Sequence, residues 1–156
     1  METTLIILKP DAVQRGLCGR IISRFEDKGL QIVAAKMILI TPRLAEQHYA
    51  VHRGKPFYDK LIRFMTASPV LVLAVAGINA IQISRTMMGH TFGSNAEPGT
   101  IRGDFGLSNS FNLIHGSDSP ESAKTELRLF FTDHEIIPYD RAIEGYVYDL
   151  SAGTRE

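Results

Sequence analysis

The residues best suited to chemistry in this chain lie in the segment 112–118, with the sequence NLIHGSD. It places one imidazole, that of His115, at the end of a short apolar run and just before the signals of a helix start. Because histidine titrates near neutrality, its free nitrogen lone pair can attack phosphorus at pH 7 when a second group fixes the ring. His115 is therefore a candidate covalent nucleophile, although a lone histidine beside apolar residues is more often structural.

A partner for this imidazole lies eleven residues downstream, at Glu126. One face of an expected helix consists of Ala123, Glu126, Leu127 and Phe130, so a carboxylate takes a place that the pattern favours for an apolar side chain. The helix turns back directly after His115, so Glu126 can reach the ring and fix its tautomer and orientation. The spacing alone equally allows Glu126 to lean out into solvent.

Several other side chains are suited to binding a polyphosphate. Phosphoryl transfer depends on positioning and charge neutralisation, so it requires cations and hydroxyl donors that converge on phosphate oxygens. The candidates are Lys9, Tyr49, Arg85, Thr91 and Arg102. Each of them taken singly is more often a solvated surface residue, so the prediction depends on the set.

The elements that must position these residues follow from apolar periodicity. Continuous apolar runs predict buried strands at residues 4–8, 30–40 and 70–76, with a last short strand near His115. Helical spacing predicts helices at 17–28, 42–52, 57–67 and 80–88, with Asn79 as the cap of the fourth. Strands interspersed with helices in this order predict an α+β fold.

Two later segments frame the candidate nucleophile. Residues 90–112 carry scattered glycines and no periodicity, which is typical of a long functional or disordered loop. A helix then runs to about Phe131. Its start is either Asp118 with Glu121 as a capping box, or Ser119 as the cap with Pro120 in the first turn.

Length and composition limit the class of protein. A chain of 156 residues suits one domain, which we place at residues 1–150 with a short tail at 151–156. The 17 basic and 17 acidic residues cancel, which argues against a surface built for nucleic acid or an anionic membrane. The single cysteine, Cys18, excludes an intramolecular disulfide, and no secretion signal or long apolar span is evident. We expect a soluble, cytoplasmic protein.

Four segments together resemble the nucleoside diphosphate kinase family. They are KPDAVQRG at 9–16, His48-Tyr49 followed by Lys55-Pro56-Phe57, PGTIRGDF at 98–105, and NLIHGSD at 112–118. The resemblance runs from about residue 3 to residue 131. It implies a ferredoxin-like α+β domain, a four-stranded antiparallel sheet covered by helices, assembled as a tetramer or hexamer. It also implies a ping-pong reaction in which a nucleoside triphosphate phosphorylates a histidine and a nucleoside diphosphate collects the phosphate.

Carried over position by position, the resemblance assigns roles to the candidates. His115 would be phosphorylated, oriented by Glu126, with Ser117 hydrogen-bonded to that carboxylate. Lys9 would lie near the transferring group, and Tyr49 beside the histidine. The residues that would bind the nucleotide are Lys9, Phe57, Arg85, Thr91, Arg102 and Asn112. Phe57 would stack on the base. Such a site accepts any base, because every base has a π face. Mg²⁺ would arrive on the nucleotide phosphates, with no cluster of protein ligands.

The chain departs from the family pattern in two places. Phe92-Gly93 follows Thr91 where the family usually has Asn-Pro, so the loop and its subunit contacts are expected to differ. Asn109 and Ser110-Phe111 precede Asn112 where many members have a small or aliphatic residue and then Gly-Arg, which predicts a reshaped base slot.

Two other classes of protein compete with the kinase. A non-catalytic binding module could hold nucleotide or a protein partner without turnover, but it needs no oriented nucleophile. A small metalloprotein could use His48 and His52, four residues apart on the expected helix 42–52. Without a third ligand nearby, a solvated or packed helix face is the better interpretation of that pair.

Overall fold

A computed structural model describes residues 1–155 of the chain, so the final residue of the expected tail, Glu156, lies outside the described residues. Its centre is an antiparallel four-stranded sheet in the order β2-β3-β1-β4. The strands are β1 (Glu2–Leu8), β2 (Gln31–Ile38), β3 (Val70–Gly77) and β4 (Ile114–Gly116). This confirms the expected ferredoxin-like α+β fold.

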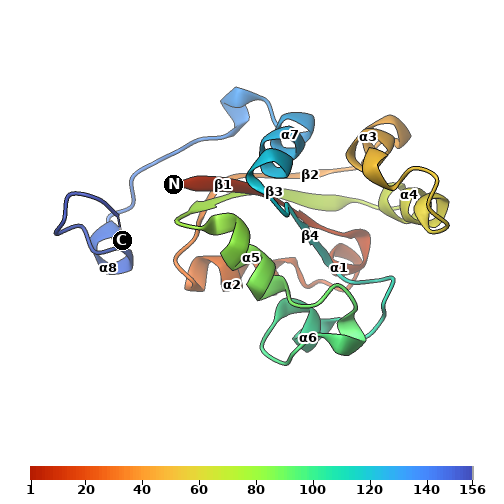
Figure 1. The fold of residues 1–156 in the computed structure, drawn as a ribbon, viewed down its shortest axis with the longest axis horizontal. Coiled ribbons are helices and arrows are strands. Elements are labelled where there is room, and N and C mark those ends of the chain that lie inside the picture. Colours follow the sequence, from red (N-terminus) through yellow and green to blue (C-terminus); the bar gives the residue numbers. More distant parts are fainter. Residues whose placement is uncertain (156) are drawn as a thin grey trace.

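Helices cover both faces of the sheet (Figure 1). One face is packed by α3 (Pro42–His48), α4 (Tyr58–Thr66) and α7 (Pro120–Phe130). The other face is packed by α1 (Pro10–Gln14), α2 (Cys18–Asp27), α5 (Ala80–Met88) and α6 (Ile101–Phe105). The short helices η1 (Ala50–His52), η2 (Gly93–Asn95) and η3 (Asp133–Glu135) lie in the connections.

The double cover explains why β1 is apolar at nearly every position. Successive side chains of a strand point to opposite faces of the sheet. Leu5 and Ile7 accordingly join the core beneath α3, α4 and α7, whereas Ile6 and Leu8 join the core on the α2 side. All four side chains are fully buried, so the strand that precedes Lys9 is held rigidly from both sides.

Several predicted elements need correction. The expected helix 42–52 ends at His48, and a separate 3-10 turn follows it. The segment 90–112, expected to be irregular, contains η2 and α6, and the short helix α1 was not expected at all. Asn79 stands at the start of α5 with φ of 51° and makes no capping bond, while Glu2 accepts from the backbone N–H of Ile81. For α7 the second alternative is correct, because the Ser119 side chain accepts from Ser122 N.

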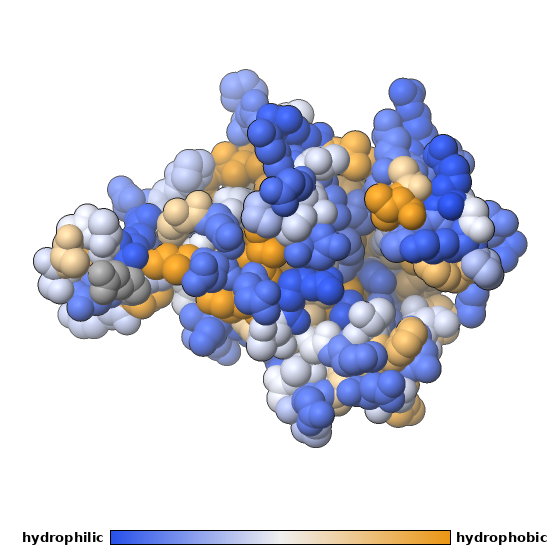
Figure 2. Space-filling view, viewed as in Figure 1, coloured by the Kyte–Doolittle hydropathy of each residue, from blue (hydrophilic) through white to orange (hydrophobic). Residues whose placement is uncertain are grey.

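The chain beyond α7 runs back along the sheet as an arm that carries α8 (Glu144–Val147) near its end (Figure 1). Ile137 N donates to Val33 O, and the side chain of Gln31 donates to Tyr139 O, so the arm follows β2. Figure 2 shows its end as a lobe beside the main body, with hydrophobic surface between the two. None of the helices in the described part of the chain is both long and apolar enough to cross a membrane.

Candidate active site

A strained turn sets the position of His115 on β4. Leu113 is fully buried with φ of 70°, and Ile114 N donates across it to Asn112 O at 2.8 Å, which makes a tight three-residue turn. Lys9 N donates to Leu113 O, and Leu113 N donates to Asp11 Oδ2. A non-glycine residue persists in this backbone region only where its surroundings hold it, so the start of β4 is tied firmly to the end of β1.

The expected contact between His115 and Glu126 is present. His115 Nε2 lies 2.9 Å from Glu126 Oε2, and Ser117 Oγ donates to the same oxygen at 2.8 Å. Burial raises the pKa of Glu126, but the hydrogen bonds and charge from His115 and the bond from Ser117 outweigh it, so the net pKa is lowered. An ionised carboxylate only accepts, so Nε2 is the nitrogen that donates to Glu126, and in the neutral ring the lone pair resides on Nδ1.

His48 lies against this pair, which the sequence did not predict. Its ring meets the ring of His115 edge to face at 4.7 Å and also packs against Tyr49 and Phe130. Burial, aided by the charge of His115, lowers the pKa of His48 to about 3, and neither ring nitrogen has a hydrogen-bond partner among the described protein atoms. His48 is packed, as the favoured interpretation of the His48–His52 pair expected, whereas His52 lies beyond the end of α3 and turns toward Phe57.

Lys9 and Asn112 form the first part of a cationic wall. Lys9 Nζ donates to Asn112 Oδ1 at 2.7 Å, and Asn112 Nδ2 donates to Thr91 O at 2.9 Å. Burial and the nearby charge of Arg102 lower the pKa of Lys9 to about 8. A buried ammonium with a lowered pKa gains charge-stabilising contacts when an anion binds beside it.

The two arginines differ in how they are held. Arg102 is buried and donates to three backbone carbonyls, those of Gly89, Asn112 and Ile114, so it also braces the strained turn. Burial and the charge of Arg85 lower the pKa of Arg102 to about 10. Within residues 1–155, Arg85 makes one long side-chain bond, to Gly116 O at 3.4 Å, which leaves most of its donors available to a ligand.

These side chains line one cavity of about 580 Å³. The predicted residues on its wall are Lys9, Tyr49, Phe57, Arg85, Thr91, Arg102, Asn112 and His115, while Ser117 and Glu126 lie behind the histidine. Phe57 stands at the mouth, 47% exposed. Burial and the charge of Glu126 raise the pKa of Tyr49, whose buried hydroxyl has no partner among the described protein atoms.

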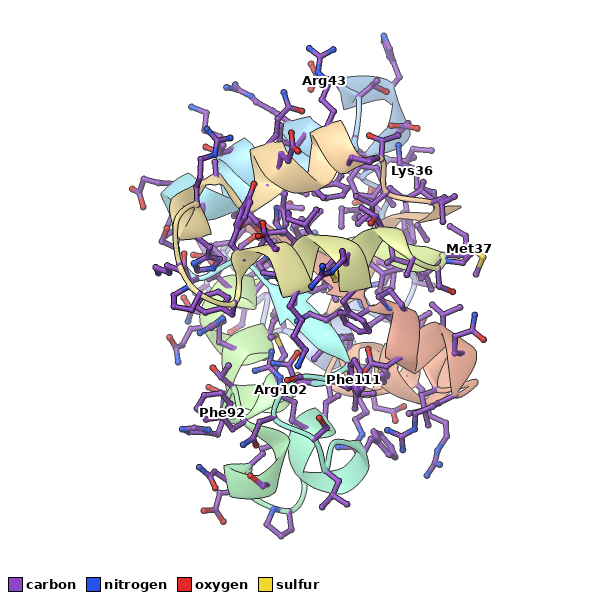
Figure 3. The ribbon with its side chains drawn as sticks, turned by 90° about the vertical axis from the view of Figure 1, so that its right-hand side faces the viewer. Lys36, Met37, Arg43, Phe92, Arg102 and Phe111 are labelled. Atoms are coloured by element: carbon purple, nitrogen blue, oxygen red, sulfur yellow. The ribbon has the colours of Figure 1, made fainter. Side chains whose placement is uncertain are left out.

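The segments that depart from the family pattern line the same cavity. Phe92 and Phe111, one from each altered segment, lie near Arg102 in the lower half of Figure 3, and all three side chains line the cavity. Ser94 donates to Asn109 Oδ1 at 2.8 Å, which ties the two altered segments together. Glycine is required at position 93 because the backbone there passes close to that of Gly106; a Cβ at position 93 would lie 2.5 Å from Gly106 O.

Comparison with known proteins assigns this architecture. The family model of nucleoside diphosphate kinase matches residues 2–136. The chain belongs to this family. The nucleoside diphosphate kinase of Staphylococcus epidermidis is 53% identical over 149 residues, 96% of this chain and 100% of that protein. That of Archaeoglobus fulgidus is 51% identical over 149 residues, 96% of this chain and 99% of its own.

Solved structures of nucleoside diphosphate kinases share the fold. The halophilic enzyme from Halobacterium salinarum, in complex with CDP, has a TM-score of 0.93 and 45% identity, covering 95% of this chain and 99% of that one. A structure of the enzyme from Borrelia burgdorferi, in which bound vanadate and ADP mimic the transition state, has a TM-score of 0.87 and 38% identity, covering 94% of this chain and 97% of that one. The predicted kinase family is therefore confirmed, and this chain is a nucleotide-binding phosphotransferase.

The candidate site includes residues that the sequence did not point to. His48 was treated as part of a helix-face pair, and Asp118 only as a possible helix cap, yet Asp118 lines the cavity. Phe64 packs on Phe111 with ring centroids 5.0 Å apart, which continues the aromatic wall from Phe57. The His48-Tyr49 dipeptide in the second motif was the available signal for an inward-facing histidine.

Proposed function

We propose that this kinase carries the transferred phosphate on Nδ1 of His115. The observation behind the proposal is the bond of 2.9 Å between His115 Nε2 and Glu126, which leaves the Nδ1 lone pair free. Because Glu126 holds the ring and Ser117 in turn holds Glu126, the nucleophile is oriented before nucleotide binds, and no reorganisation is needed during the reaction.

The reaction then consists of two mirror-image steps. In the first, the Nδ1 lone pair forms a bond to the γ-phosphorus, the bond from that phosphorus to the β,γ-bridging oxygen breaks, and the nucleoside diphosphate leaves. In the second, a β-phosphate oxygen of another nucleoside diphosphate attacks the same phosphorus, and the N–P bond breaks. Glu126 stabilises the ring's charge while it carries the phosphoryl group, because it already accepts from Nε2.

The cationic wall neutralises the phosphate charge. Arg85 has the freest donors and would bind the β- and γ-oxygens, with Arg102 and the Thr91 hydroxyl alongside. Lys9, held by its bond to Asn112, would lie beside the transferring phosphoryl group. Lys9 and Asn112 would also contact the sugar of the nucleotide. The Tyr49 hydroxyl would donate beside the histidine, and the base would stack on Phe57 at the mouth.

The donor set fits magnesium that arrives with the nucleotide. Asp118 is the one carboxylate among the described residues on the cavity wall, which also carries the basic side chains of Lys9, Lys60, Arg85 and Arg102. Mg²⁺ prefers phosphate oxygens, water and one or two carboxylates, so Asp118 is the protein group suited to it. When bound, Mg²⁺ neutralises charge on the β- and γ-phosphates.

Incubation with γ-labelled ATP and Mg²⁺ tests the proposal. We expect a phosphoprotein that is labile to acid and stable to base, and that loses its label when a nucleoside diphosphate is added. A His115→Ala variant should take up no label. A label that persists after the diphosphate is added, or one that forms in the variant, would show that His115 is not the carrier. Binding of nucleotide without any labelling would instead indicate a binding module.

We also propose a cytoplasmic homo-oligomer, a tetramer or hexamer, whose domain spans 1–150 with a tail at 151–156. Its single cysteine suits a reducing compartment, and its charge balance offers no general attraction to nucleic acid or membranes. Sedimentation equilibrium would give the subunit number. A monomer at micromolar concentration would contradict the assembly.

A further inference from the structure

A second use of the nucleophile's surroundings is suggested by His48, which the phosphotransfer mechanism leaves unused and which lies beside His115 and Glu126. His48, His115 and Glu126 each offer a ligand atom, and these atoms lie within 4.8 Å of one another. They come from α3, β4 and α7, so the sheet and two helices converge on one point. Two imidazoles and one carboxylate form a donor set typical of zinc.

The buried imidazole of His48 is the independent sign of a ligand. Its side chain is nine-tenths buried, it faces the ring of His115, and neither of its nitrogens has a partner among the described protein atoms. Buried polar groups in folded proteins nearly always have a hydrogen-bond partner or coordinate a metal. Phosphate chemistry accounts for His115 and Glu126 but not for His48.

We propose that His48, His115 and Glu126 form a site for a borderline transition-metal dication such as Zn²⁺, and that its occupation switches off the phosphate-accepting histidine. Zn²⁺ favours imidazole nitrogen, whereas Mg²⁺ favours oxygen, so the ion that serves the nucleotide does not compete for this site.

The geometry requires only side-chain adjustment. Metal bonds of about 2.0–2.1 Å set the ligand atoms of a tetrahedral centre roughly 3.3 Å apart. The Nε2–Oε2 distance of 2.9 Å would widen slightly, and the separations of up to 4.8 Å would contract by about 1.5 Å. The side chains of His115 and Glu126 are 22% and 16% exposed, so a fourth position is open to water.

The neighbouring charges set the strength of the site. Glu126 supplies one negative charge, while Lys9, Arg85 and Arg102 on the cavity wall repel a dication. We therefore expect reversible binding, weaker than in a structural zinc site with thiolate ligands. Nucleotide phosphates also need these cations, so bound metal and bound nucleotide are expected to influence each other.

Metal binding would disable His115 by two routes, a consequence that rests on the proposed function. Nε2 gives up its proton to solvent to take the metal, and Glu126 leaves the ring to become a ligand. The dication then withdraws electron density from Nδ1, which weakens its attack on phosphorus. Inhibition by Zn²⁺ at saturating Mg²⁺ would follow.

Titration of the full chain with Co²⁺ tests the site without nucleotide. We expect one Co²⁺ per chain with the intense visible absorption of four-coordinate cobalt, displaced by Zn²⁺ and not by excess Mg²⁺. His48→Leu and Glu126→Gln should each weaken binding by more than about 100-fold, because even residues that only support a ligand contribute about 10- to 100-fold. His52→Gln and His134→Gln are matched histidine controls that should bind normally.

A second measurement, labelling from γ-labelled ATP and Mg²⁺, tests the inhibition. Zn²⁺ should block phosphoenzyme formation in the unaltered chain and in His134→Gln, and should lose this effect in His48→Leu. Normal Co²⁺ binding by His48→Leu, loss of binding in His52→Gln, or equal Zn²⁺ inhibition with and without His48 would overturn the proposal. Absence of labelling without Zn²⁺ would refute the phosphohistidine instead and leave the cobalt result intact.

Discussion

Replacement of Glu126 by alanine isolates the effect of orienting the nucleophile. Glu126 lies behind His115 and does not line the nucleotide cavity, so the change removes no contact with substrate. The lost interaction is a hydrogen bond to a charged group, worth about 1.5–3 kcal/mol. Both side chains are largely buried, at 22% and 16% exposed, so the upper half of that range applies. About 1.4 kcal/mol corresponds to a tenfold change in rate, and the expected loss is therefore about 100-fold.

Single-turnover labelling separates the two quantities that matter. With enzyme in excess over γ-labelled ATP and Mg²⁺, the limiting rate reports chemistry, and its half-saturation reports nucleotide affinity. We expect the limiting rate of Glu126→Ala to fall by about 100-fold, with half-saturation nearly unchanged. Glu121→Ala is the matched control, since it removes an exposed carboxylate from the first turn of the same helix. If affinity falls as much as the rate, Glu126 is structural and the orientation argument is refuted.

Three further perturbations address the remaining parts of the site. Because the pKa of Lys9 is lowered to about 8, the folded chain loses this charge as the pH rises above 8, and KM for nucleotide should increase there. Between pH 8 and 10.5 the unfolded chain binds more protons than the folded chain, so Lys9 also makes the free energy of unfolding rise with pH. Both trends should vanish in Lys9→Met. Phe57→Ala should raise KM about tenfold for adenine, guanine and cytosine nucleotides alike, because stacking ignores base identity, and a loss confined to one base would contradict stacking. His48→Leu should raise the free energy of unfolding by about 1 kcal/mol in urea titrations, because it removes two buried nitrogens without partners among the described protein atoms. His134→Leu, at an exposed position, should change it little, and a lower urea midpoint for His48→Leu would show that His48 has a hidden partner.

Much of the fold could be predicted from local patterns. The apolar runs of β1 and β3 and the spacing in α2, α4 and α7 are properties of a few consecutive residues, and those elements were predicted within a few positions. Short elements held by distant contacts could not be predicted. Arg24 of α2 donates to Gly99 O just before α6 and to Asp104 within α6, so a residue from another helix orders a segment that looks irregular in sequence. The start of α5 likewise depends on Glu2 rather than on the adjacent Asn79.

The candidate site divides in the same way. The sequence predicted most of its side chains, because the four motifs contain Lys9, Arg102 and His115, the helical pattern points to Glu126, and the chemistry follows from residue type. The tertiary structure decided whether Glu126 turns in or out, where His48 faces, and which nitrogen of His115 is free. Those outcomes depend on helices packed against a sheet, where burial makes an unpaired polar group costly and leaves one arrangement favourable. No local pattern contains that information, because the partners come from β4, α3 and α7 and meet only in the folded chain.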